Sequence, residues 1–310
     1  MHGDPMHGDP MHGYPILGYP MLGYPMLVIE PQVPWDDREE VMSRLTFHHT
    51  DFAPETLALG RQLSVSVCIP ARDEAATIGS IVESVRTHFC ARAGGVDLVD
   101  EVVVVDDGSS DETAEVAADA GATVVQKRGA AAGKGEAMQL AVQSSTGDVI
   151  VFLDGDVDPF PPHFVTGLLG PVLTGDFALV KATYGRPLNG VPGEGGRVNE
   201  LVARPVISLL YPELAGVRQP LAGETAAPRT VLEKVRLAPQ YGVELALLID
   251  VASMFGANSI AQVELGERVH RNRPLAELAP QATQVLRVAL ERRGLPVIAA
   301  LRAEQGTAGS

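Results

Sequence analysis

The stretch Val-Val-Val-Val-Asp-Asp-Gly-Ser-Ser-Asp-Glu-Thr, at residues 102–113, decides the fold class. The β-branched run Val102–Val105 is typical of a strand buried on both faces, as in a parallel sheet covered by helices. Ser109 and Glu112 have the spacing of a capping box, which predicts that a helix follows directly. The carboxylates between strand and helix therefore lie at the carboxyl end of the strand, where open α/β sheets bind ligands.

The alternation of strand and helix continues on both sides of this stretch. Apolar runs predict further strands at Val65–Ile69, Thr123–Val125, Val149–Leu153, Phe177–Tyr184 and Ala261–Leu265. Helical spacing of apolar residues predicts helices at Ile78–Phe89, Gly135–Ser145, Val198–Leu210, Glu244–Phe255 and Pro274–Arg293. Strands that alternate with helices indicate βαβ units, so the expected fold class is α/β, with an open, mainly parallel sheet flanked by helices.

Composition divides the chain into five segments. Residues 1–30 are mostly imperfect pentapeptide repeats rich in Gly and Pro, which predicts a disordered tail rather than a metal site built from its His residues. Residues 31–64 form a lead-in segment with a short helix. Residues 65–180 and 181–300 are two halves of one domain, because no polar linker separates them, and residues 301–310 are a flexible C-terminus.

Charge and composition exclude several classes of protein. The 310 residues include 24 Lys and Arg against 39 Asp and Glu, a net charge of −15, which argues against nucleic-acid binding. An anionic ligand would need a metal ion or a local basic cluster. Cys68 and Cys90 cannot form a disulfide framework, which favours a cytoplasmic location. The uncharged residues 10–29 contain too much Gly and Pro for a membrane span.

Acidic and polar residues follow three of the predicted strands. They are Pro70-Ala71-Arg72-Asp73-Glu74, Asp106-Asp107-Gly108-Ser109 and Asp154-Gly155-Asp156. Asp73 and Asp111, taken alone, are better explained as helix caps. Asp154 and Asp156 differ, since residues two apart in an extended segment point the same way and can face one cation. Such hard oxygen ligands suit Mg²⁺ or Mn²⁺, which bind substrate phosphates.

Basic residues in this acidic chain are the candidates for holding an anion. Lys134 lies between two glycines and is either a charge for a phosphate or a solvated surface lysine. The cluster Arg268, His270, Arg271 and Arg273 follows a predicted strand and would reverse the sign of the charge locally. Arg197, beside a glycine pair, can hold a phosphate or carboxylate with two hydrogen bonds.

Together, the three strand-end motifs resemble those of GT-A nucleotide-sugar glycosyltransferases. Other segments resemble the glucosyl-3-phosphoglycerate synthases of actinobacteria, over roughly residues 65–295. They are Gly133-Lys134-Gly135-Glu136-Ala137, Gly195-Gly196-Arg197-Val198, Gln219-Pro220-Leu221, Tyr241-Gly242-Val243-Glu244 and His270-Arg271-Asn272-Arg273-Pro274. Arg72, Asp73, Gly155 and Asn199 depart from the pattern of that family.

This resemblance implies a GT-A fold and a retaining transfer of glucose from UDP-glucose to the 2-hydroxyl of 3-phosphoglycerate. The product, glucosyl-3-phosphoglycerate, would enter methylglucose lipopolysaccharide synthesis at an early step. The resemblance also implies Mg²⁺, with Mn²⁺ or Co²⁺ as substitutes, and a cytoplasmic homodimer. Residues 65–180 would then bind the nucleotide sugar, and residues 181–300 the acceptor.

The resemblance also assigns residues to roles. Uridine contacts would come from Pro70, Ala71, Glu74 and Asp107, and Lys134 would lie near the diphosphate. Asp154 would contact the ribose or metal side of the donor, and Asp156 and His270 would bind the metal. Leu221 and Glu244 would line the glucose, and Arg197, Asn199 and Asn272, with Arg268 assisting, would hold phosphoglycerate. Asp156, Glu244 and Lys134 are the expected catalytic residues.

Three other functions stay open at the level of sequence. An inverting GT-A transferase with a lipid-phosphate or polysaccharide acceptor shares the strand-end motifs but needs a carboxylate base. A sugar-phosphate nucleotidyltransferase needs a Gly-rich phosphate loop, which Pro70-Ala71-Arg72 does not provide. A non-catalytic regulator would bind UDP-glucose and metal without turnover. Retention itself has two routes: departure and attack on one face of the sugar, or a covalent intermediate on Glu244.

Overall fold

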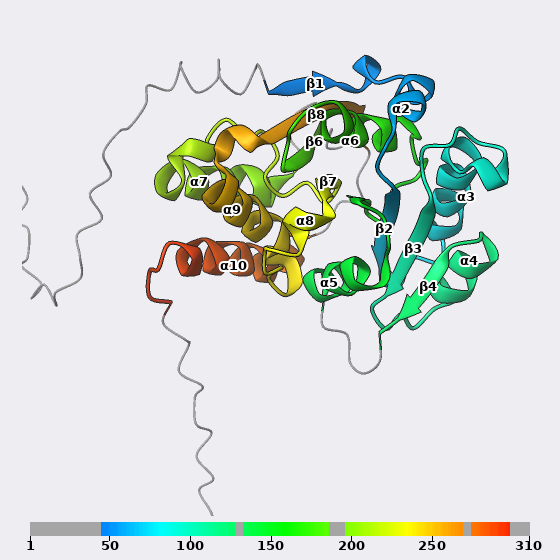
Figure 1. Cartoon of the computed structure of the whole chain (residues 1–310). Coiled ribbons are helices and arrows are strands. Elements are labelled where there is room, and N and C mark those ends of the chain that lie inside the picture. The colour runs from blue at the N-terminus through cyan, green and yellow to red at the C-terminus, as the bar shows by residue number, and fades with distance from the viewer. Residues whose placement is uncertain (1–44, 128–132, 186–195, 269–273, 298–310) are drawn as a thin grey trace, which may run out of the picture. The chain divides into compact units, whose positions relative to one another are not determined.

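A single mixed sheet organises the chain. A computed structural model describes residues 45–127, 133–185, 196–268 and 274–297. Within them, eight strands run in the order β1-β8-β6-β7-β5-β2-β3-β4 (Figure 1). They are β1 (Thr46–His48), β2 (Val65–Ala71), β3 (Glu101–Asp106), β4 (Thr123–Gln126), β5 (Val149–Phe152), β6 (Leu179–Gly185), β7 (Thr225–Pro228) and β8 (Ile260–Glu267). All pairs are parallel except those of β7, which confirms the predicted open, mainly parallel sheet.

Helices cover both faces of the sheet. They are α2 (Pro54–Gly60), α3 (Ile78–Phe89), α4 (Thr113–Asp119), α5 (Lys134–Ser144), α6 (His163–Thr174), α7 (Arg204–Leu210), α8 (Arg229–Leu232), α9 (Val243–Phe255) and α10 (Leu275–Arg292). One apolar core contains α3 and α6, and the other contains α5, α7 and α9. Among the residues described, no helix combines the length and apolar character that a membrane span requires.

The run of valines in β3 is explained by this double covering. Val102 and Val104 belong to the core beneath α3 and α6, while Val103 and Val105 belong to the core beneath α5 and α9. Successive side chains of a strand point to opposite faces, so a strand that is buried on both sides is apolar throughout. The prediction of a fully buried central strand is confirmed.

The strand order reverses between β2 and β5. From β2 the chain moves outward to β3 and β4, and then returns to place β5 on the other side of β2. Such a reversal leaves a crevice outside the carboxyl ends of the strands, because the connections on its two sides lie on opposite faces. Ala71 pairs with Asp106, and Cys68 with Phe152, so the three strand-end motifs start at neighbouring positions.

Two local predictions need correction. The capping box at Ser109 and Glu112 is not formed, because α4 begins later, at Thr113, and the Ser109 hydroxyl instead accepts the backbone N–H of Asp73 at 3.0 Å. A contact between two loops thus overrides a local helix signal. The helix expected over residues 198–210, with an interruption at Pro205, is instead continuous across Pro205, because a π-helical turn, Asn199–Ala203, leads directly into α7. Pro205, which has no N–H to donate, lies in the first turn of α7.

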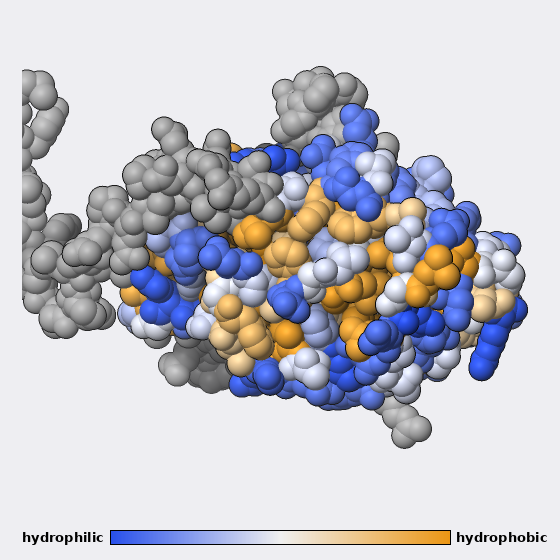
Figure 2. Space-filling view, turned by 45° about the horizontal axis from the view of Figure 1, so that its top comes forward, coloured by the Kyte–Doolittle hydropathy of each residue, from blue (hydrophilic) through white to orange (hydrophobic). Residues whose placement is uncertain are grey.

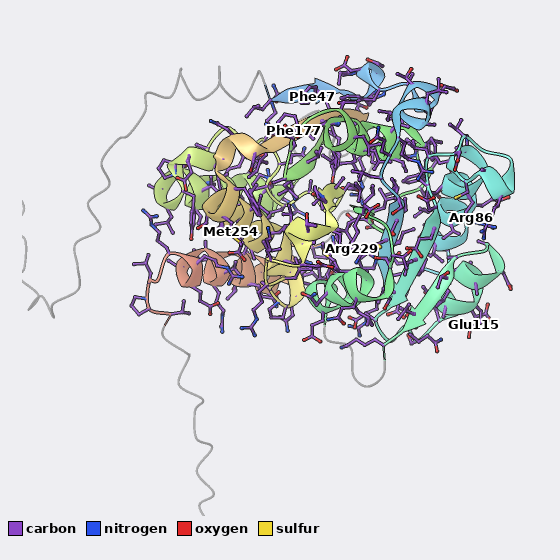
Figure 3. The ribbon with its side chains drawn as sticks, in the orientation of Figure 1. Phe47, Arg86, Glu115, Phe177, Arg229 and Met254 are labelled. Carbon is purple, nitrogen blue, oxygen red and sulfur yellow. The ribbon has the colours of Figure 1, made fainter. Side chains whose placement is uncertain are left out.

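The lead-in segment supplies an edge strand as well as the expected short helix. Parallel pairing places β1 beside β8, and α2 follows it. Phe47 packs against Phe52 and Phe177, with ring centroids 5.7 Å apart in each pair. Figure 3 labels Phe47 and Phe177. The Phe52 ring also lies against Gly170 of α6, where an added Cβ would be 2.1 Å from a ring carbon.

We expect Gly170→Ala to destabilise the fold by roughly 1–3 kcal/mol, because the new methyl group must displace the Phe52 ring from α6. Denaturant unfolding of the purified variant measures this free energy. Gly60→Ala is the matched control, since a Cβ at Gly60 meets no atom within 4 Å. Equal unfolding midpoints for wild type and Gly170→Ala would contradict the docking of Phe52 on α6.

Candidate functional site

A cleft of about 830 Å³ opens at the carboxyl ends of β2, β3 and β5. It is lined by residues 70–74, Asp107, Gly133, Lys134, Glu136, Ala137, Asp154, Gly155, Asp156, Pro239, Gln240, Tyr241 and Gln284. The three strand-end motifs thus share one cavity, as expected for the crevice where the strand order reverses. The start of α5 forms one wall, and Gln284 of α10 contributes to another.

Lys134 joins two carboxylates at the floor of this cleft. Its Nζ lies 2.6 Å from Oδ1 of Asp154 and 2.7 Å from Oε1 of Glu244. Burial would lower the pKa of Lys134, but the two carboxylates outweigh it and raise that pKa above its usual value. Lys134 is therefore charged and held in place, so it is not a freely solvated surface lysine.

Arg268, which directly follows β8, also forms ion pairs with the acidic residues of this cleft. One guanidinium nitrogen is 2.9 Å from Oδ2 of Asp154, and the other is 2.7 Å from Oδ1 of Asp156. The first nitrogen also donates to the buried carboxylate of Glu224, which accepts a further hydrogen bond from the Tyr184 hydroxyl at 2.8 Å. The Arg268 side chain is only 2 % exposed, so its charge is balanced almost entirely by these carboxylates.

Burial and charge act in opposite directions on the two acids beside Arg268. Burial raises the pKa of Glu224 above its ordinary value, although the guanidinium opposes that shift. Burial would also raise the pKa of Asp154, but Lys134 and Arg268 outweigh it and hold that pKa below its ordinary range. Asp154 is thus the ionised centre on which the cations of the site converge.

Backbone hydrogen bonds fasten the loop after β2 to the loop after β3. Asp73, in the left-handed region at φ 57°, accepts the N–H of Ser110 at 2.7 Å, and these bonds lower its pKa. Asp111 accepts the N–H of Thr113 at 3.1 Å and that of Ala75 at 3.1 Å. The interpretation of Asp73 and Asp111 as helix caps is therefore wrong, because the N-caps of α3 and α4 are Thr77 and Glu112, neither of which has a side-chain cap bond. The two carboxylates instead bind backbone N–H groups that tie one loop to the other.

The structure brings most of the expected site residues together. Pro70, Ala71, Glu74, Asp107, Lys134, Asp154 and Asp156 line the cleft. Glu244 and Arg268 reach it through ion pairs. Leu221, Asn199 and Arg197 are not among the lining residues. The Leu221 N–H is 3.5 Å from Oδ1 of Asn199. His270 and Asn272 lie outside the described residues.

Several residues at the site carry no signal in the sequence. Glu224 and Tyr184 bind Arg268 across long sequence separations, and no spacing rule links them. At Gly223 an added Cβ would lie 2.1 Å from Oδ1 of Asp154 and 2.5 Å from Nζ of Lys134. The backbone at residue 223 therefore presses directly on the ion pair, which only a glycine allows.

We expect Asp154→Asn to lower the melting temperature strongly at pH 7, because Lys134 and Arg268 lose a shared counter-charge. The folded-state pKa of Asp154 is depressed, so its stabilisation is complete above the unfolded value of about 3.9 and is lost as the pH falls below it. The difference between wild type and variant should therefore shrink in melts below about pH 4. A difference in melting temperature that does not change with pH would contradict this assignment. Asp119→Asn, on the exposed surface of α4, is the control.

Comparisons with known proteins agree with this geometry. The family described as Glycosyl transferase family 2 matches residues 66–195. A glucosyl-3-phosphoglycerate synthase from Mycolicibacterium paratuberculosis is 47 % identical over 248 residues, which cover 75 % of this chain and 73 % of the relative. Residues 66–195 include all three strand-end motifs, so the sequence match contains most of the residues that line the cleft, while residues 239–241 and Gln284 lie outside it.

Two solved structures show how far the likeness extends in space. The Mycobacterium tuberculosis glucosyl-3-phosphoglycerate synthase, in complex with Mn²⁺, UDP and phosphoglyceric acid, has a TM-score of 0.73 and 42 % identity, covering 82 % of this chain and 87 % of that one. A mannosyl-3-phosphoglycerate synthase from Rubrobacter xylanophilus has a TM-score of 0.77 and 37 % identity, over 85 % and 86 % of the two chains. By sequence and by fold, this chain belongs to the glucosyl-3-phosphoglycerate synthase family of GT-A glycosyltransferases.

Proposed function

We propose that this protein transfers glucose from UDP-glucose to the 2-hydroxyl of 3-phosphoglycerate, with retention at the anomeric carbon, to give glucosyl-3-phosphoglycerate. The convergence of Asp154, Asp156 and Lys134 in one cleft is the observation that carries the proposal. Relatives named for this product, at 46–47 % identity, support it. The arrangement offers both a place for a cation and a fixed positive charge, which a nucleoside diphosphate leaving group requires.

The donor would occupy the cleft along the end of β2. In this proposal Pro70, Ala71, Glu74 and Asp107 surround the uridine. The Asp107 carboxylate accepts the N–H of Gly133 at 2.8 Å, and the Asp107 N–H donates to the carbonyl of Ala71 at 3.0 Å. These bonds join the ends of β2 and β3 to the start of α5, so the uracil base would pack against a surface held in place by hydrogen bonds.

We propose a divalent metal ion at Asp156, with further ligands from outside the described residues, because these contain no group of three His, Cys, Asp or Glu side chains placed to hold one. Its side chain is 40 % exposed, and Arg268 is the partner of only one of its oxygens among the described residues. Carboxylate oxygen is the ligand that Mg²⁺ and Mn²⁺ prefer. When bound, the ion would stabilise negative charge on the diphosphate as a Lewis acid. We propose Asp156 and His270 as its ligands, with Mg²⁺ preferred and Mn²⁺ or Co²⁺ as substitutes.

Lys134 and Glu244 would act on the donor together. The Lys134 ammonium, fixed by Asp154 and Glu244, places a point charge where negative charge develops on the leaving diphosphate. Glu244 is 9 % exposed and engaged in its ion pair, which weakens it as a nucleophile. This pairing favours departure and attack on one face of the sugar, with the diphosphate helping to deprotonate the acceptor. Leu221 and Glu244 would line the glucose.

Acceptor binding is proposed for Arg197, Asn199 and Asn272. The Asn199 side chain is buried and donates to the carbonyl of Arg218 at 3.2 Å, so its amide has a fixed orientation. Arg268 would assist, but its present contacts are with Asp154, Asp156 and Glu224. Its first task in this proposal is therefore to hold these carboxylates together and to fix their orientation.

We further propose a cytoplasmic homodimer that acts early in methylglucose lipopolysaccharide synthesis. Large apolar side chains on α7, α9 and the π-helical turn are exposed, with Leu201 at 73 %, Leu209 at 57 % and Met254 at 50 %. Apolar residues also gather near the centre of the face shown in Figure 2. Exposed apolar surface of this kind is typical of protein interfaces. The division into a nucleotide-sugar half at 65–180 and an acceptor half at 181–300 belongs to the same proposal.

A second candidate is transfer of mannose from a nucleotide-activated donor to the same acceptor. The structural likeness to the mannosyl-3-phosphoglycerate synthase, at a TM-score of 0.77, favours it. The two candidates share the cleft and the acceptor and differ only in the donor. A direct competition between donors therefore separates them.

We expect incubation with UDP-glucose, Mg²⁺ and a panel of phosphorylated three-carbon acids to give a hexosyl product with 3-phosphoglycerate alone. Mass spectrometry identifies the product, and a parallel reaction with GDP-mannose measures the competing donor. A reaction with EDTA should give none, because Asp156 would lack its cation. Absence of product with every three-carbon acid, or product only with a lipid phosphate, would contradict the proposed acceptor.

We expect Asp156→Ala to lose most transfer activity while its melting temperature stays near that of wild type. The half-exposed side chain fills no core volume, and Arg268 keeps Asp154 and Glu224 as partners. Initial rates and thermal melts of the same preparation test both parts. Asp176→Ala, which removes an exposed carboxylate away from the cleft, should keep wild-type rates. Near-normal turnover in Asp156→Ala would rule out the metal assignment.

A further inference from the structure

Lys181 is a lysine in the interior of the sheet. It lies on β6, where it pairs with Thr225 of β7 and Gln262 of β8, and the residue is 1 % exposed. Its Nζ donates to the carbonyl oxygen of Ala222 at 2.5 Å, which is its one hydrogen bond within the described residues. Neither its sequence context nor the proposed chemistry gives this ammonium a role.

A buried lysine of this kind weakens a fold unless its ammonium is well compensated. Removing an ammonium from water is unfavourable, and a hydrogen bond to one carbonyl compensates only part of this cost. Burial accordingly lowers the pKa of Lys181 to about 8, although the nearby carboxylates of Glu244, Glu224 and Asp154 oppose the shift and Lys134 reinforces it. Methionine would fill the same space without this cost, so stability alone does not explain the residue.

The carbonyl that Lys181 holds belongs to the turn Ala222-Gly223-Glu224. Strand β6 fastens this turn at both ends, by Lys181 to the Ala222 carbonyl and by the Ala182 N–H to the Glu224 carbonyl at 3.1 Å. Between these two bonds lies Gly223, whose backbone presses on Asp154 and Lys134. The next residue, Glu224, holds Arg268 and the Tyr184 hydroxyl. The turn therefore touches both cations that converge on Asp154.

We propose that Lys181 is a positioning residue for the transfer reaction, an inference that rests on the proposed function. By fixing the Ala222 carbonyl, its ammonium sets how closely the Gly223 backbone approaches the Lys134–Asp154 pair. A shift of the turn would move Lys134 away from the donor diphosphate. Small misplacements of charged groups at a reacting centre lower the rate far more than they lower the affinity for substrate.

The test replaces Lys181 by methionine, which keeps the length of the side chain and removes its donor. We expect kcat of Lys181→Met to fall by roughly tenfold to a hundredfold. The KM values for both substrates and the melting temperature should stay near those of wild type. Thr183→Val is the matched control, because it removes a buried hydroxyl from the same face of β6, bonded to the Val263 carbonyl at 3.4 Å. Its kcat should stay at the wild-type value.

A double variant then asks whether Lys181 acts through the turn. Gly223→Ala disturbs the same contact from the other side, so the kcat of Lys181→Met with Gly223→Ala should match that of the worse single variant. Losses that multiply would show two independent effects and overturn the proposal. A wild-type kcat in Lys181→Met would overturn the proposal as well. So would a large fall in the melting temperature of Lys181→Met if Thr183→Val lost the same amount of kcat and of melting temperature.

Hydrogen exchange separates this inference from the proposed function. Amide exchange at residues 222–224 needs no substrate, and it should be faster in Lys181→Met than in wild type or Thr183→Val, because the turn is then fastened at one end only. Unchanged exchange would overturn the positioning role even if glucose transfer is observed. If exchange is faster in Lys181→Met but the wild-type protein transfers no glucose, the contact between Lys181 and the turn is supported and the proposed reaction is wrong.

Discussion

The double ion pair of Asp154, with Lys134 on one side and Arg268 on the other, is the interaction on which the rest of the site depends. The two cations come from the start of α5 and from the end of β8, and Asp154 itself follows β5. Three separate elements must therefore end at one point. An unpaired charge there would be costly, because the surroundings are largely buried and screen it weakly.

The balance of charge at this point explains how an acidic protein can hold an anionic substrate. Close to Asp154, the described residues place the cations Lys134, Lys181 and Arg268 among the carboxylates Asp154, Asp156, Glu224 and Glu244. Formal charges of +3 and −4 give this group a net charge of −1, and the other charged residues that line the cleft, Arg72, Asp73, Glu74, Asp107 and Glu136, add −3. The proposed divalent ion at Asp156 would bring the group close to Asp154 to +1, whereas the net charge of −15 describes the chain as a whole.

Local patterns predicted the regular elements well and the irregular ones poorly. The helix Ile78–Phe89 has the predicted bounds, and β3 contains the predicted valine run, because apolar periodicity reflects the face that each element buries. In contrast, β7 is Thr-Ala-Ala-Pro, and β1 is only three residues long. Neither segment shows the alternation of apolar and polar residues that predicts a strand. Both are strands only because neighbouring strands offer free N–H and C=O groups at that place.

The sequence by itself determined the fold class and the strand-end motifs, and it predicted that Asp154, Asp156 and Lys134 lie at one site, because each depends on a signal within a few neighbouring residues. Only the tertiary structure decided the partners of Arg268, the approach of Gly223 to Asp154 and the contact of Lys181 with Ala222. Those interactions join residues about 40–110 positions apart in sequence. Electrostatic and steric contacts depend on distance through space, and no sequence spacing encodes that distance.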